Sequence, residues 1–449
     1  MALPHSIGKA NVPVWSEFAT SQTDFGTTVH SGVFIYRKEV GNGSNLIEDI
    51  RLQFNYRDYN FTDQDLIQVA VFAIEMVYVP AKEFFIGDGT SPKALYANGK
   101  DLVIKTDVPN GQQSLMGKIT GEKGWTYNGT SIPDTFPKGY EAFYMMKYEI
   151  TQHGYADFLN TLTPGQQANR AAVNPFAAKG SLALVAPGYT SNPLQYRNYV
   201  RIRIPAQEET DDYPAKGAVF GHSMTGANVD SLWERESNGG NIACNFLSWD
   251  DGLAYLDWSC LRPMTEMEFE KACRGHQFLR RGMAWGYQYG IAANAYAITD
   301  PGLATEISSN PSACYLETGK APWVMRVGAF AKDSTMRNEA GASYYGIMEL
   351  SGNLWERCVN VSTEAGRSFI PREGDGALND QTGDAEVEDM MSGVTCWPAE
   401  DGGGFRGFQV SNRTYAESTY TNNAREGNRT PWYGFRGCRY PPAGTKFDL

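Results

Sequence analysis

The sequence predicts an α+β protein built from more than one domain. At 449 residues the chain is longer than one typical domain, and its 42% hydrophobic and 13% aromatic residues are enough for a large core. Its first part carries runs in which apolar and polar residues alternate, a pattern typical of half-buried strands. Later segments repeat apolar residues at the spacing of one helix face. Both strands and helices are therefore expected.

The N-terminal part, residues 1–68, is polar and rich in Gly, Thr and Asn. Residues 33–37 (VFIYR) and 50–56 (IRLQFNY) alternate apolar with polar side chains, so we predict strands there. This part is expected to form a small β-rich domain or an assembly arm. Residues 69–79 (VAVFAIEMVYV) are a nearly continuous run of β-forming residues, and they lead into a main domain that we place at 69–449.

Three segments of the main domain are predicted to be helices that face a core. Residues 151–162 (TQHGYADFLNTL) place four apolar side chains at the i, i+3, i+4 and i+7 positions of one face. Ser248 followed by Asp251, and Thr265 followed by Glu268, match the pattern in which a side-chain oxygen accepts a hydrogen bond from a free amide of the first helical turn. Each pair therefore predicts the start of a short helix.

Two stretches are interpreted as insertions. Residues 164–240 contain scattered Pro, Gly and Asn together with short apolar runs, which favours an ordered insertion over a disordered linker. Residues 360–404 are rich in glycine and acidic residues, for which a solvated acidic loop is the expected structure and an additional cation site is the alternative. The acidic residues are Asp375, Asp380, Asp384, Glu386, Glu388 and Asp389.

Charge and composition argue against several classes of protein. The net charge is −12 and the pI is near 5.1, whereas a surface that binds nucleic acid needs clustered Lys and Arg, which the sequence lacks. The N-terminus (MALPHSIGKANVPVW) has neither the basic start nor the apolar core of a signal peptide, and the chain has no run of about 18 apolar residues. Neither Sec export nor membrane insertion is expected.

The residue types that most often carry chemistry show no established motif. The seven cysteines form no CxxC pair and leave at least one thiol unpaired, so we expect buried thiols and synthesis in the reducing cytoplasm. The five histidines are isolated, with no HxxxH or HxH spacing for a zinc or iron site. No GxGxxG, GxSxG or P-loop is present. Each histidine is expected to be a surface residue or a satisfied core residue.

Residues 344–356 (YYGIMELSGNLWE) combine two glycines and an Asn with apolar residues, and they carry Glu349 and Glu356. A tight turn here would offer oxygens at two close points, as a hard cation requires. The alternative is a turn that joins two core strands, in which Trp355 provides packing and both glutamates face water. The residues of the turn by themselves favour this second interpretation.

The same turn resembles the GxYDMxGNVWEW signature of the formylglycine-generating-enzyme family, also called the sulfatase-modifying-factor domain. Further segments resemble other motifs of that family and follow in the family's order between residues 75 and 440. They are residues 75–87 (EMVYVPAKEFFIG), 143–151 (FYMMKYEIT), 245–275 (with SWDDGLAYLDW and LRPMTEMEFEKACRG), 285–286 (WG), 406–407 (RG) and 434–437 (GFRG). The resemblance implies a C-type-lectin-like fold with insertions for residues 69–449.

Catalytic members of the family that the chain resembles use two cysteines, four residues apart, which bind copper and oxidise a substrate cysteine. These cysteines lie between the RGGSW and GFR motifs. Here that interval runs from Phe405 to Gly437 and contains no Cys, Met or His. Because Cu(I) selects soft sulfur ligands, we expect no copper and no oxidase chemistry.

This interval instead contains a polar segment, residues 411–433 (SNRTYAESTYTNNAREGNRTPWY), with four Asn, four Thr, three Tyr, three Arg and two Ser and no Val, Ile, Leu or Met. Such a composition suits a recognition surface, because Tyr and Trp give rigid contact area while Asn, Ser and Thr give adaptable hydrogen bonds. A polar loop without function is the alternative. Phe405, Arg406 and Trp432 are expected to contribute to the scaffold. The candidate ligand-binding residues are Ser411, Asn412, Tyr415, Ser418, Tyr420, Asn422, Asn423, Arg425, Asn428, Trp432 and Tyr433.

The polar segment also resembles the C-terminal variable region of proteins that are diversified by retroelements, many of which have this fold. In those proteins adenine-directed mutagenesis enriches Asn, Tyr, Ser and Thr just before a fixed GFRG-like end, which here is residues 434–437. The resemblance implies a non-catalytic protein that binds a protein or another macromolecule through this surface. One alternative is an enzyme of the same fold with altered chemistry. The other is a structural component of a virion or surface complex, attached through residues 1–68, so the working location is open between the cytoplasm, a virion and a cell surface.

The family resemblance further implies a structural calcium site at the turn of residues 344–356. Carried over residue by residue, its ligands would be the side chains of Glu349 and Glu356 and the main-chain carbonyls of Gly352 and Leu354. Glu349 replaces an Asn of the family motif, and the added charge should strengthen the binding of a hard cation. A second family site would begin near Asn294, but the residues that should complete it fall in a poorly matched stretch, 299–320.

Overall fold

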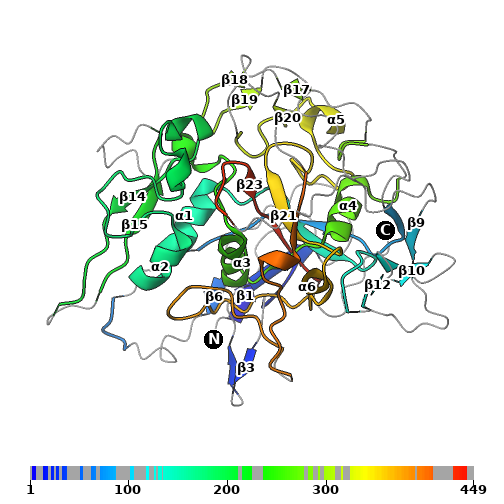
Figure 1. Cartoon of the computed structure of the whole chain (residues 1–449), viewed down its shortest axis with the longest axis horizontal. Helices are drawn as coiled ribbons and strands as arrows, with labels where there is room; N and C mark the ends of the chain where they lie inside the picture. Colours follow the sequence, from blue (N-terminus) through cyan, green and yellow to red (C-terminus); the bar gives the residue numbers. More distant parts are fainter. Residues whose placement is uncertain are drawn as a thin grey trace.

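Figure 1 shows the computed structural model of the chain. It describes residues 71–86 and 130–441, except residues 134, 211–214, 225–235, 278–281, 287–291, 294–297, 309–314, 317–323, 390–391 and 408–427. Elsewhere it describes residues 3–6, 14–18, 22–24, 27–29, 33–37, 51–53, 62–66, 102–105, 118–120 and 126–127. Asn294, where a second cation site was considered, lies outside the described residues.

Antiparallel strand pairs make up the described segments of the first 53 residues. They are β1 (Leu3–Ser6) with β6 (Arg51–Gln53), β2 (Val14–Phe18) with β5 (Val33–Arg37), and β3 (Gln22–Asp24) with β4 (Thr27–Val29). The run predicted as a strand at 33–37 is β5, and the run at 50–56 contains β6. The ring of Phe34 in β5 packs edge-on against Tyr144 of the main part of the chain, with ring centroids 4.8 Å apart. That residues 1–68 fold as a separate domain stays a prediction.

A four-stranded antiparallel sheet brings distant parts of the chain together. Its order is β16-β24-β13-β7, formed by β16 (Arg262–Pro263), β24 (Gly437–Arg439), β13 (Phe143–Met146) and β7 (Met76–Val79). Every residue of β13 is buried, so the sheet lies inside the molecule. The pairing of β24 with both β13 and β16 places the C-terminal GFRG motif next to this sheet.

A second sheet, in the order β22-β21-β23, holds both ends of the polar segment. The central strand β21 (Trp355–Val359) is buried throughout; β22 (Gly403–Arg406) runs antiparallel to it and β23 (Tyr433–Gly434) parallel. Arg406 pairs with Glu356, and Tyr433 pairs with Trp355. The chain therefore leaves β22 and returns into β23 at the same end of β21, and Figure 1 shows β21 and β23 side by side.

The three predicted helices are present, and the two with predicted caps begin directly after those caps. They are α1 (Gln152–Asn160) after Thr151, α3 (Trp249–Trp258) after Ser248 and α4 (Glu266–Arg274) after Thr265. In α3 and α4 the cap is reciprocal, because the side chains of Asp251 and Glu268 also accept a hydrogen bond from the amide of the cap residue. The caps supply partners for donors that the first helical turn leaves free, so they fix where each helix starts.

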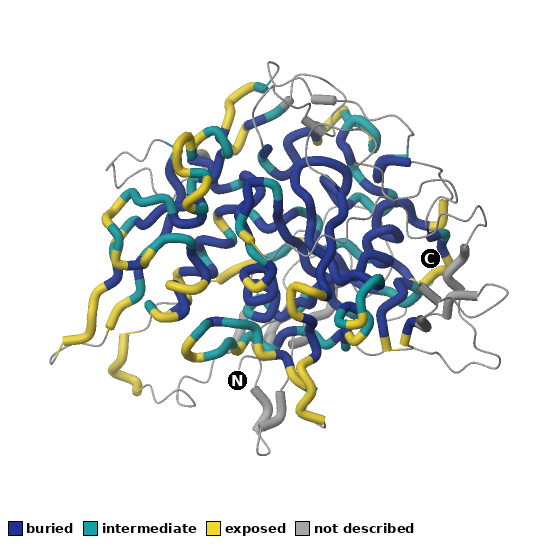
Figure 2. The backbone as a smooth tube through the Cα atoms, viewed as in Figure 1, coloured by how far each residue is buried: buried dark blue, intermediate teal, exposed yellow. Residues whose placement is uncertain are grey.

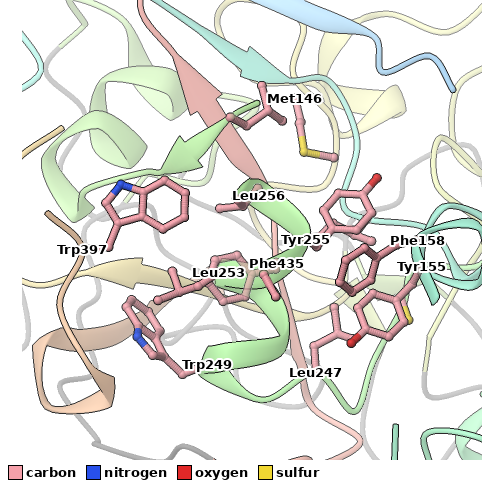
Figure 3. Close-up of a cluster of buried hydrophobic side chains, with 14 of the residues drawn as sticks. Met146, Tyr155, Phe158, Leu247, Trp249, Leu253, Tyr255, Leu256, Trp397 and Phe435 are labelled. Atoms are coloured by element: carbon pink, nitrogen blue, oxygen red, sulfur yellow. The ribbon is translucent and has the colours of Figure 1, made fainter. Parts of the chain in front are cut away.

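The main hydrophobic core surrounds α3. Figure 3 shows Trp249, Leu253 and Leu256 of this helix close to Phe435. A Cβ atom at Gly252 would lie only 2.0 Å from the ring of Phe435. A larger side chain at position 252 would therefore displace Phe435, which explains a glycine inside a helix despite its unfavourable propensity. This contact joins α3 to the GFRG motif.

The described residues of the first insertion, 164–240, form several short elements and pack against α1. It contains α2 (Pro164–Arg170), two short 3₁₀ turns (Pro187–Tyr189 and Pro193–Tyr196) and the hairpin of β14 (Val200–Ile204) and β15 (Val219–His222). The side chain of Asn160 in α1 accepts a hydrogen bond from the amide of Phe220 at 2.7 Å and donates one to its carbonyl at 3.0 Å. Figure 1 shows the hairpin beside α1 and α2.

The second insertion, residues 360–404, is not the solvated acidic loop that the sequence led us to expect. It contains α6 (Glu364–Arg367) and several buried apolar side chains, among them Phe369 and Trp397. The buried carboxylate of Asp257 in α3 accepts hydrogen bonds from the amides of Asp375 and Glu386, both at 3.0 Å. Burial raises the pKa of Asp257 to about 7. The stretch folds onto α3 because its apolar residues and its main-chain donors find partners there.

The remaining described elements are short. They are the sheet of β8 (Phe84–Ile86), β9 (Leu102–Lys105) and β10 (Lys118–Thr120), the pairs β11 (Thr126–Tyr127) with β12 (Thr130–Ser131), β17 (Ala292–Ala293) with β20 (Tyr315–Leu316) and β18 (Ile298–Thr299) with β19 (Ile307–Ser308), and α5 (Arg337–Ala340). Figure 2 shows the buried residues gathered in the middle of the molecule. Within the described part of the chain no helix combines the length and the apolar character needed to cross a membrane.

Candidate functional site

Most of the candidate ligand-binding residues fall outside the described residues. These are Ser411, Asn412, Tyr415, Ser418, Tyr420, Asn422, Asn423 and Arg425. Asn428, Trp432 and Tyr433 are described, and so are the two points at which the chain enters and leaves residues 408–427. The site is therefore defined by how these two ends are held.

Arg406, just before the polar segment, is fixed by two carboxylates of α4. Its Nη1 donates to Glu270 at 3.0 Å and its Nη2 to Glu266 at 3.2 Å, and all three side chains are buried. Gly407 follows with a φ of +87°, in the region that favours glycine, and its carbonyl accepts a hydrogen bond from the amide of Gly352 at 2.7 Å. The chain thus leaves β22 at two fixed residues: Arg406 is bound to α4, and Gly407 is bound to Gly352.

Arg357 of β21 holds the other end of the segment. Its Nη2 donates to the carbonyl oxygen of Asn428 at 2.9 Å. Its guanidinium carbon lies 5.0 Å from the ring centre of Phe405 and 4.9 Å from that of Tyr433. The two rings stack on each other with centroids 4.1 Å apart, so cation–π and stacking contacts reinforce one another. Phe405, Tyr433 and Arg357 form a buried platform between the two ends of the segment.

Tyr433 belongs to this platform, which corrects its assignment to a ligand-facing surface. Its side chain is 7% exposed because β23 pairs with β21 and the ring of Phe405 covers it. Trp432 is half-buried, and its ring meets Tyr189 edge-on at 5.9 Å. Asn428 is exposed. Of the described candidates, Asn428 and Trp432 are accessible to a ligand, whereas Tyr433 supports the scaffold.

A pocket of about 600 Å³ lies beside the returning end of the polar segment. Three elements line it: the end of the polar segment, the region from the end of α2 to the first 3₁₀ turn, and the start of α3. The lining residues are Asn428, Arg429, Thr430, Asn169, Arg170, Ala171, Ala172, Ala186, Pro187, Tyr189, Ser248 and Asp250. Sequence reasoning missed the α2 side, because residues 164–240 match no family motif. On the other sides it identified Ser248 as a helix cap and Asn428 as a candidate ligand-binding residue.

The buried carboxylate of Asp251 ties the walls of this pocket together. It accepts hydrogen bonds from Nε and Nη2 of Arg429, both at 2.7 Å, and from the amide of Ser248 at 2.9 Å. Nη1 of Arg170 lies 3.5 Å from the same carboxylate, and Nη2 of Arg170 donates to Asp384 at 2.7 Å. Two guanidinium groups and two carboxylates thus balance in charge and fix α2, α3 and residue 429 relative to one another.

In the turn predicted to bind calcium, Glu356 is buried and forms an ion pair with an arginine from outside the turn. The guanidinium of Arg436, from the GFRG motif, donates through Nε and Nη2 to the two carboxylate oxygens of Glu356, which is 0% exposed. Glu356 therefore does not face an open cation site, because the chain itself supplies its cation. The amide of Leu354 donates to Glu149 at 3.1 Å. This arrangement differs from the expected one, in which Glu349 and Glu356 offered their oxygens side by side.

The two carboxylate oxygens of Glu349 differ in their hydrogen bonding. Its Oε1 accepts a hydrogen bond from the amide of Gly328 at 2.9 Å, while its buried Oε2 has no partner in the part of the chain that the structure describes. Burial raises the pKa of Glu349 to about 7, and burial together with the nearby Glu356 raises that of Glu149 well above its usual range. Three buried carboxyl groups thus lie near the one guanidinium of Arg436, and burial disfavours their charged forms, which a bound hard cation would favour.

Carboxylates alone do not form a metal cluster at this turn. Among the described residues, no group of three or more His, Cys, Asp or Glu side chains could hold a metal ion. A calcium ion here would depend on main-chain carbonyls such as those of Gly352 and Leu354, together with Glu349. The calcium site with Glu349, Gly352, Leu354 and Glu356 stays a prediction.

The described cysteines are buried thiols, as predicted. They are Cys244, Cys260, Cys273, Cys358, Cys396 and Cys438, and none of these six forms a disulfide. Burial raises the pKa of Cys358 and of Cys438 well above the usual range, so these thiols stay protonated and poorly nucleophilic. Cys314 lies outside the described residues.

Two histidines that are isolated in the sequence meet in the fold. Nδ1 of His153 in α1 lies 3.1 Å from Nε2 of His222 in β15, and Nδ1 of His222 lies 3.2 Å from the carbonyl oxygen of Asn238. The pair is separated by 69 residues, so no local spacing could reveal it. His222 is a satisfied core histidine, in agreement with the prediction.

Comparison with known proteins supports the family resemblance that the sequence motifs indicated. The profile of the sulfatase-modifying factor enzyme 1-like domain (FGE-sulfatase) matches residues 107–440. Among solved structures, the chain is similar to PvdO from Pseudomonas aeruginosa, with 14% identity, a TM-score of 0.33, and coverage of 82% of this chain and 95% of that chain. It is also similar to Treponema denticola variable protein 1, with 14% identity, a TM-score of 0.26, and coverage of 78% and 99%. A comparison with curated proteins gives no match. Because the profile covers most of its length, this chain belongs to the sulfatase-modifying factor enzyme 1-like, or formylglycine-generating-enzyme, family.

Proposed function

We propose that this chain is a non-catalytic binding protein that presents its polar segment to a protein or another macromolecule. The observation that carries the proposal is the anchoring of the segment at both ends. Arg406 lies just before it and is held by the carboxylates of α4, and Arg429 lies near its end and is held by Asp251. A loop on a rigid scaffold can change in sequence with little effect on the fold, which is how many binding surfaces are built.

The composition of the segment supports recognition more than turnover. Its Tyr, Trp and Arg side chains are the types that most often dominate binding energy, and its Asn, Ser and Thr side chains adapt their hydrogen bonds to a ligand. Apart from its three tyrosines, its titratable side chains are Glu417, Glu426 and arginines, which is a poor set for acid–base catalysis near neutral pH. The interval 405–437 also lacks the sulfur ligands that a copper oxidase of this family would need.

The position of this composition, directly before the GFRG motif, supports a further proposal that the segment is diversified by a retroelement. The DNA next to the gene tests it. We expect a reverse-transcriptase gene and a near-identical template repeat of codons 405–440, with differences confined to positions where the template has adenine. Their absence would argue for a fixed binding role and would leave the binding proposal intact.

Exchange of the segment tests the binding function directly. Residues 408–427 are replaced by a Gly/Ser linker of the same length, and wild-type and exchanged proteins are used as parallel baits. We expect the melting temperature to stay within a few degrees, because the anchors remain, while the ligand captured by the wild type is lost. A ligand that is retained equally by the exchanged protein would place binding elsewhere on the molecule.

Point substitutions then test which side chains of the polar segment contact the ligand. With the captured ligand, Tyr420→Ala, Arg425→Ala and Trp432→Ala should each weaken affinity by about tenfold or more if they are dominant contacts. Asp401→Ala, at an exposed position outside the segment, is the matched control and should leave affinity unchanged. Unchanged affinity in all three variants would contradict the proposal.

The absence of oxidase activity is tested separately. The purified protein is incubated with copper, oxygen and a peptide that carries a sulfatase-type cysteine, and the peptide is analysed by mass spectrometry. We expect the cysteine to remain. Formation of formylglycine would contradict a non-catalytic role.

A further inference from the structure

Two imidazole rings point nitrogens at each other where α1 meets the hairpin of β14 and β15. Nδ1 of His153 lies 3.1 Å from Nε2 of His222, while the ring centres are 5.3 Å apart. The two nitrogens, which we call the inner nitrogens, therefore lie between the rings. This contact joins the first insertion to α1 and lies outside the polar segment, so the function proposed above does not account for it.

The outer nitrogens of the two rings face oxygen atoms that accept hydrogen bonds. Nδ1 of His222 lies 3.2 Å from the carbonyl oxygen of Asn238, and Nε2 of His153 lies 3.4 Å from a carboxylate oxygen of Asp157. Each outer nitrogen therefore favours the N–H form, and a neutral imidazole has a single N–H. In the neutral pair both inner nitrogens then carry lone pairs that face each other. A cation between them removes the repulsion.

The separation of the inner nitrogens suits a transition-metal ion. Zinc binds imidazole nitrogen at about 2.0–2.1 Å in tetrahedral geometry, which places two nitrogens of one ion about 3.3 Å apart. The inner nitrogens are 3.1 Å apart, so an increase of about 0.2 Å would admit the ion. The outer partners fit as well, because a metal-bound histidine usually donates its other N–H to a carboxylate or a main-chain carbonyl.

The two rings differ in exposure, which gives an ion a path to the inner nitrogens. His222 is 1% exposed, whereas the side chain of His153 is 46% exposed. An exposed side chain changes rotamer within nanoseconds, so the ring of His153 can turn aside and close again over the ion. Among the described residues no group of three His, Cys, Asp or Glu side chains could hold a metal ion. Water on the side of His153 would therefore complete the coordination.

We propose that His153 and His222 bind one Zn²⁺ ion, which clips the hairpin of β14 and β15 to α1. Imidazole suits zinc, whereas calcium prefers oxygen ligands, so this site is distinct from the predicted calcium turn at 344–356. The two ligands are 69 residues apart in the chain, and an ion that binds both of them stabilises the folded state alone. The inference goes beyond the proposed function, because neither histidine belongs to the polar segment.

Calorimetric titration with Zn²⁺ tests the site. The full-length protein without a histidine tag is stripped with chelator and titrated at about pH 7.5, where imidazole is mostly neutral. We expect a saturable binding step that His153→Gln and His222→Gln each weaken about tenfold or more. His276→Gln, at an exposed position outside the pair, is the matched control and should keep the wild-type affinity. Zn²⁺ should also raise the melting temperature of the wild type by a few degrees, whereas Mg²⁺ should not.

The pattern across the variants separates the alternatives. His153 and Asp157 are one helical turn apart, and an ion held by these two side chains would survive His222→Gln, which would overturn the assignment. Equal affinity of wild type and His153→Gln would also overturn it, and this variant changes an exposed side chain, so the fold should be kept. Its melting temperature in chelator should match that of the wild type. No binding of Zn²⁺ by the wild type would mean that the pair holds only a proton.

Nuclear magnetic resonance of the protein labelled with ¹⁵N-histidine identifies the bound nitrogens. We expect Zn²⁺ to shift Nδ1 of His153 and Nε2 of His222 and to leave the outer nitrogens as N–H. Shifts of the outer nitrogens instead would contradict the proposed geometry. Amide hydrogen exchange tests the clip: Zn²⁺ should slow exchange in β14 and β15 of the wild type but not of His153→Gln. Unchanged exchange in the wild type would overturn the clip.

Discussion

The guanidinium of Arg436 binds both carboxylate oxygens of Glu356, with Nη2 2.7 Å from Oε1. The same group donates to the carbonyl oxygens of Met348 at 2.9 Å and Met146 at 3.2 Å. One arginine thus connects the GFRG motif, the turn of residues 344–356 and strand β13. All of these contacts are buried. Removal of the Arg436 charge would leave the buried carboxylate of Glu356 in this scaffold without its partner.

Arg436→Met should destabilise the protein strongly. It leaves the buried carboxylates of Glu149, Glu349 and Glu356 without their shared cation, and breaking one side of a buried ion pair typically costs about 3–5 kcal/mol. Chemical denaturation followed by circular dichroism measures the change. Arg372→Met is the matched control, because Arg372 pairs with Asp389 at 2.7 Å but is 41% exposed, so its loss should cost about 1 kcal/mol or less. Equal stability of the two variants would show that Arg436 is not a central support.

Calcium should raise the melting temperature by a few degrees after chelation, because a cation that binds only the folded state stabilises it. Glu349→Gln is the informative variant, since Glu349 has the free oxygen and Glu356 is committed to Arg436. We expect Glu349→Gln to abolish the response to calcium without lowering the melting temperature in chelator. If metal analysis finds no calcium and neither chelator nor Glu349→Gln changes the melt, the turn is held by packing around Trp355 and by its ion pair.

Local physical chemistry made the helices predictable. A cap such as Ser248 or Thr265 satisfies amide donors within three residues, so the sequence next to it contains the whole interaction. Family resemblance likewise located the scaffold through short motifs that keep their order.

Partners that are distant in the sequence could not be predicted from it. The carboxylate of Glu356 looked available for a cation because Arg436 stands 80 residues away. Asp251 was expected as part of a helix cap, but its pairing with Arg429 and its nearness to Arg170 bring together residues that are far apart in the sequence and meet only in the fold. The pocket is lined by residues that come together only in the folded chain, so no local sequence pattern could predict it.

Stability should fall as the pH drops from about 6.5 to about 4, in part because of His222. Burial and the neighbouring His153 lower the pKa of His222 to about 4, below the ordinary 6.5. Within this window the unfolded chain binds a proton that the folded chain excludes, so protonation favours unfolding. The contribution is fully present above pH 6.5 and amounts to roughly 3 kcal/mol at most. Denaturant titrations at several pH values measure it.

Among the described residues, a small set of polar groups lies near the ring of His222. They are His153 and, through it, Asp157 at 3.4 Å, together with the carbonyl oxygen of Asn238. His222→Gln should flatten the dependence of stability on pH between 6.5 and 4, while the exposed His276→Gln should not. An unchanged slope in His222→Gln would assign the pH dependence to other groups, such as the carboxylates around Arg436.

Tyr433→Ala should destabilise the protein, although Tyr433 was first counted among the ligand-facing residues. Its ring stacks on Phe405 at 4.1 Å and lies against the guanidinium of Arg357, so truncation would open a cavity and leave Arg357 partly uncovered. Buried aromatic-to-alanine changes typically cost about 3–5 kcal/mol. Tyr415→Ala and Tyr420→Ala, expected to be exposed, should each change stability by about 0.5 kcal/mol or less. If Tyr433→Ala melted like these two, the platform would not be what holds the polar segment in place.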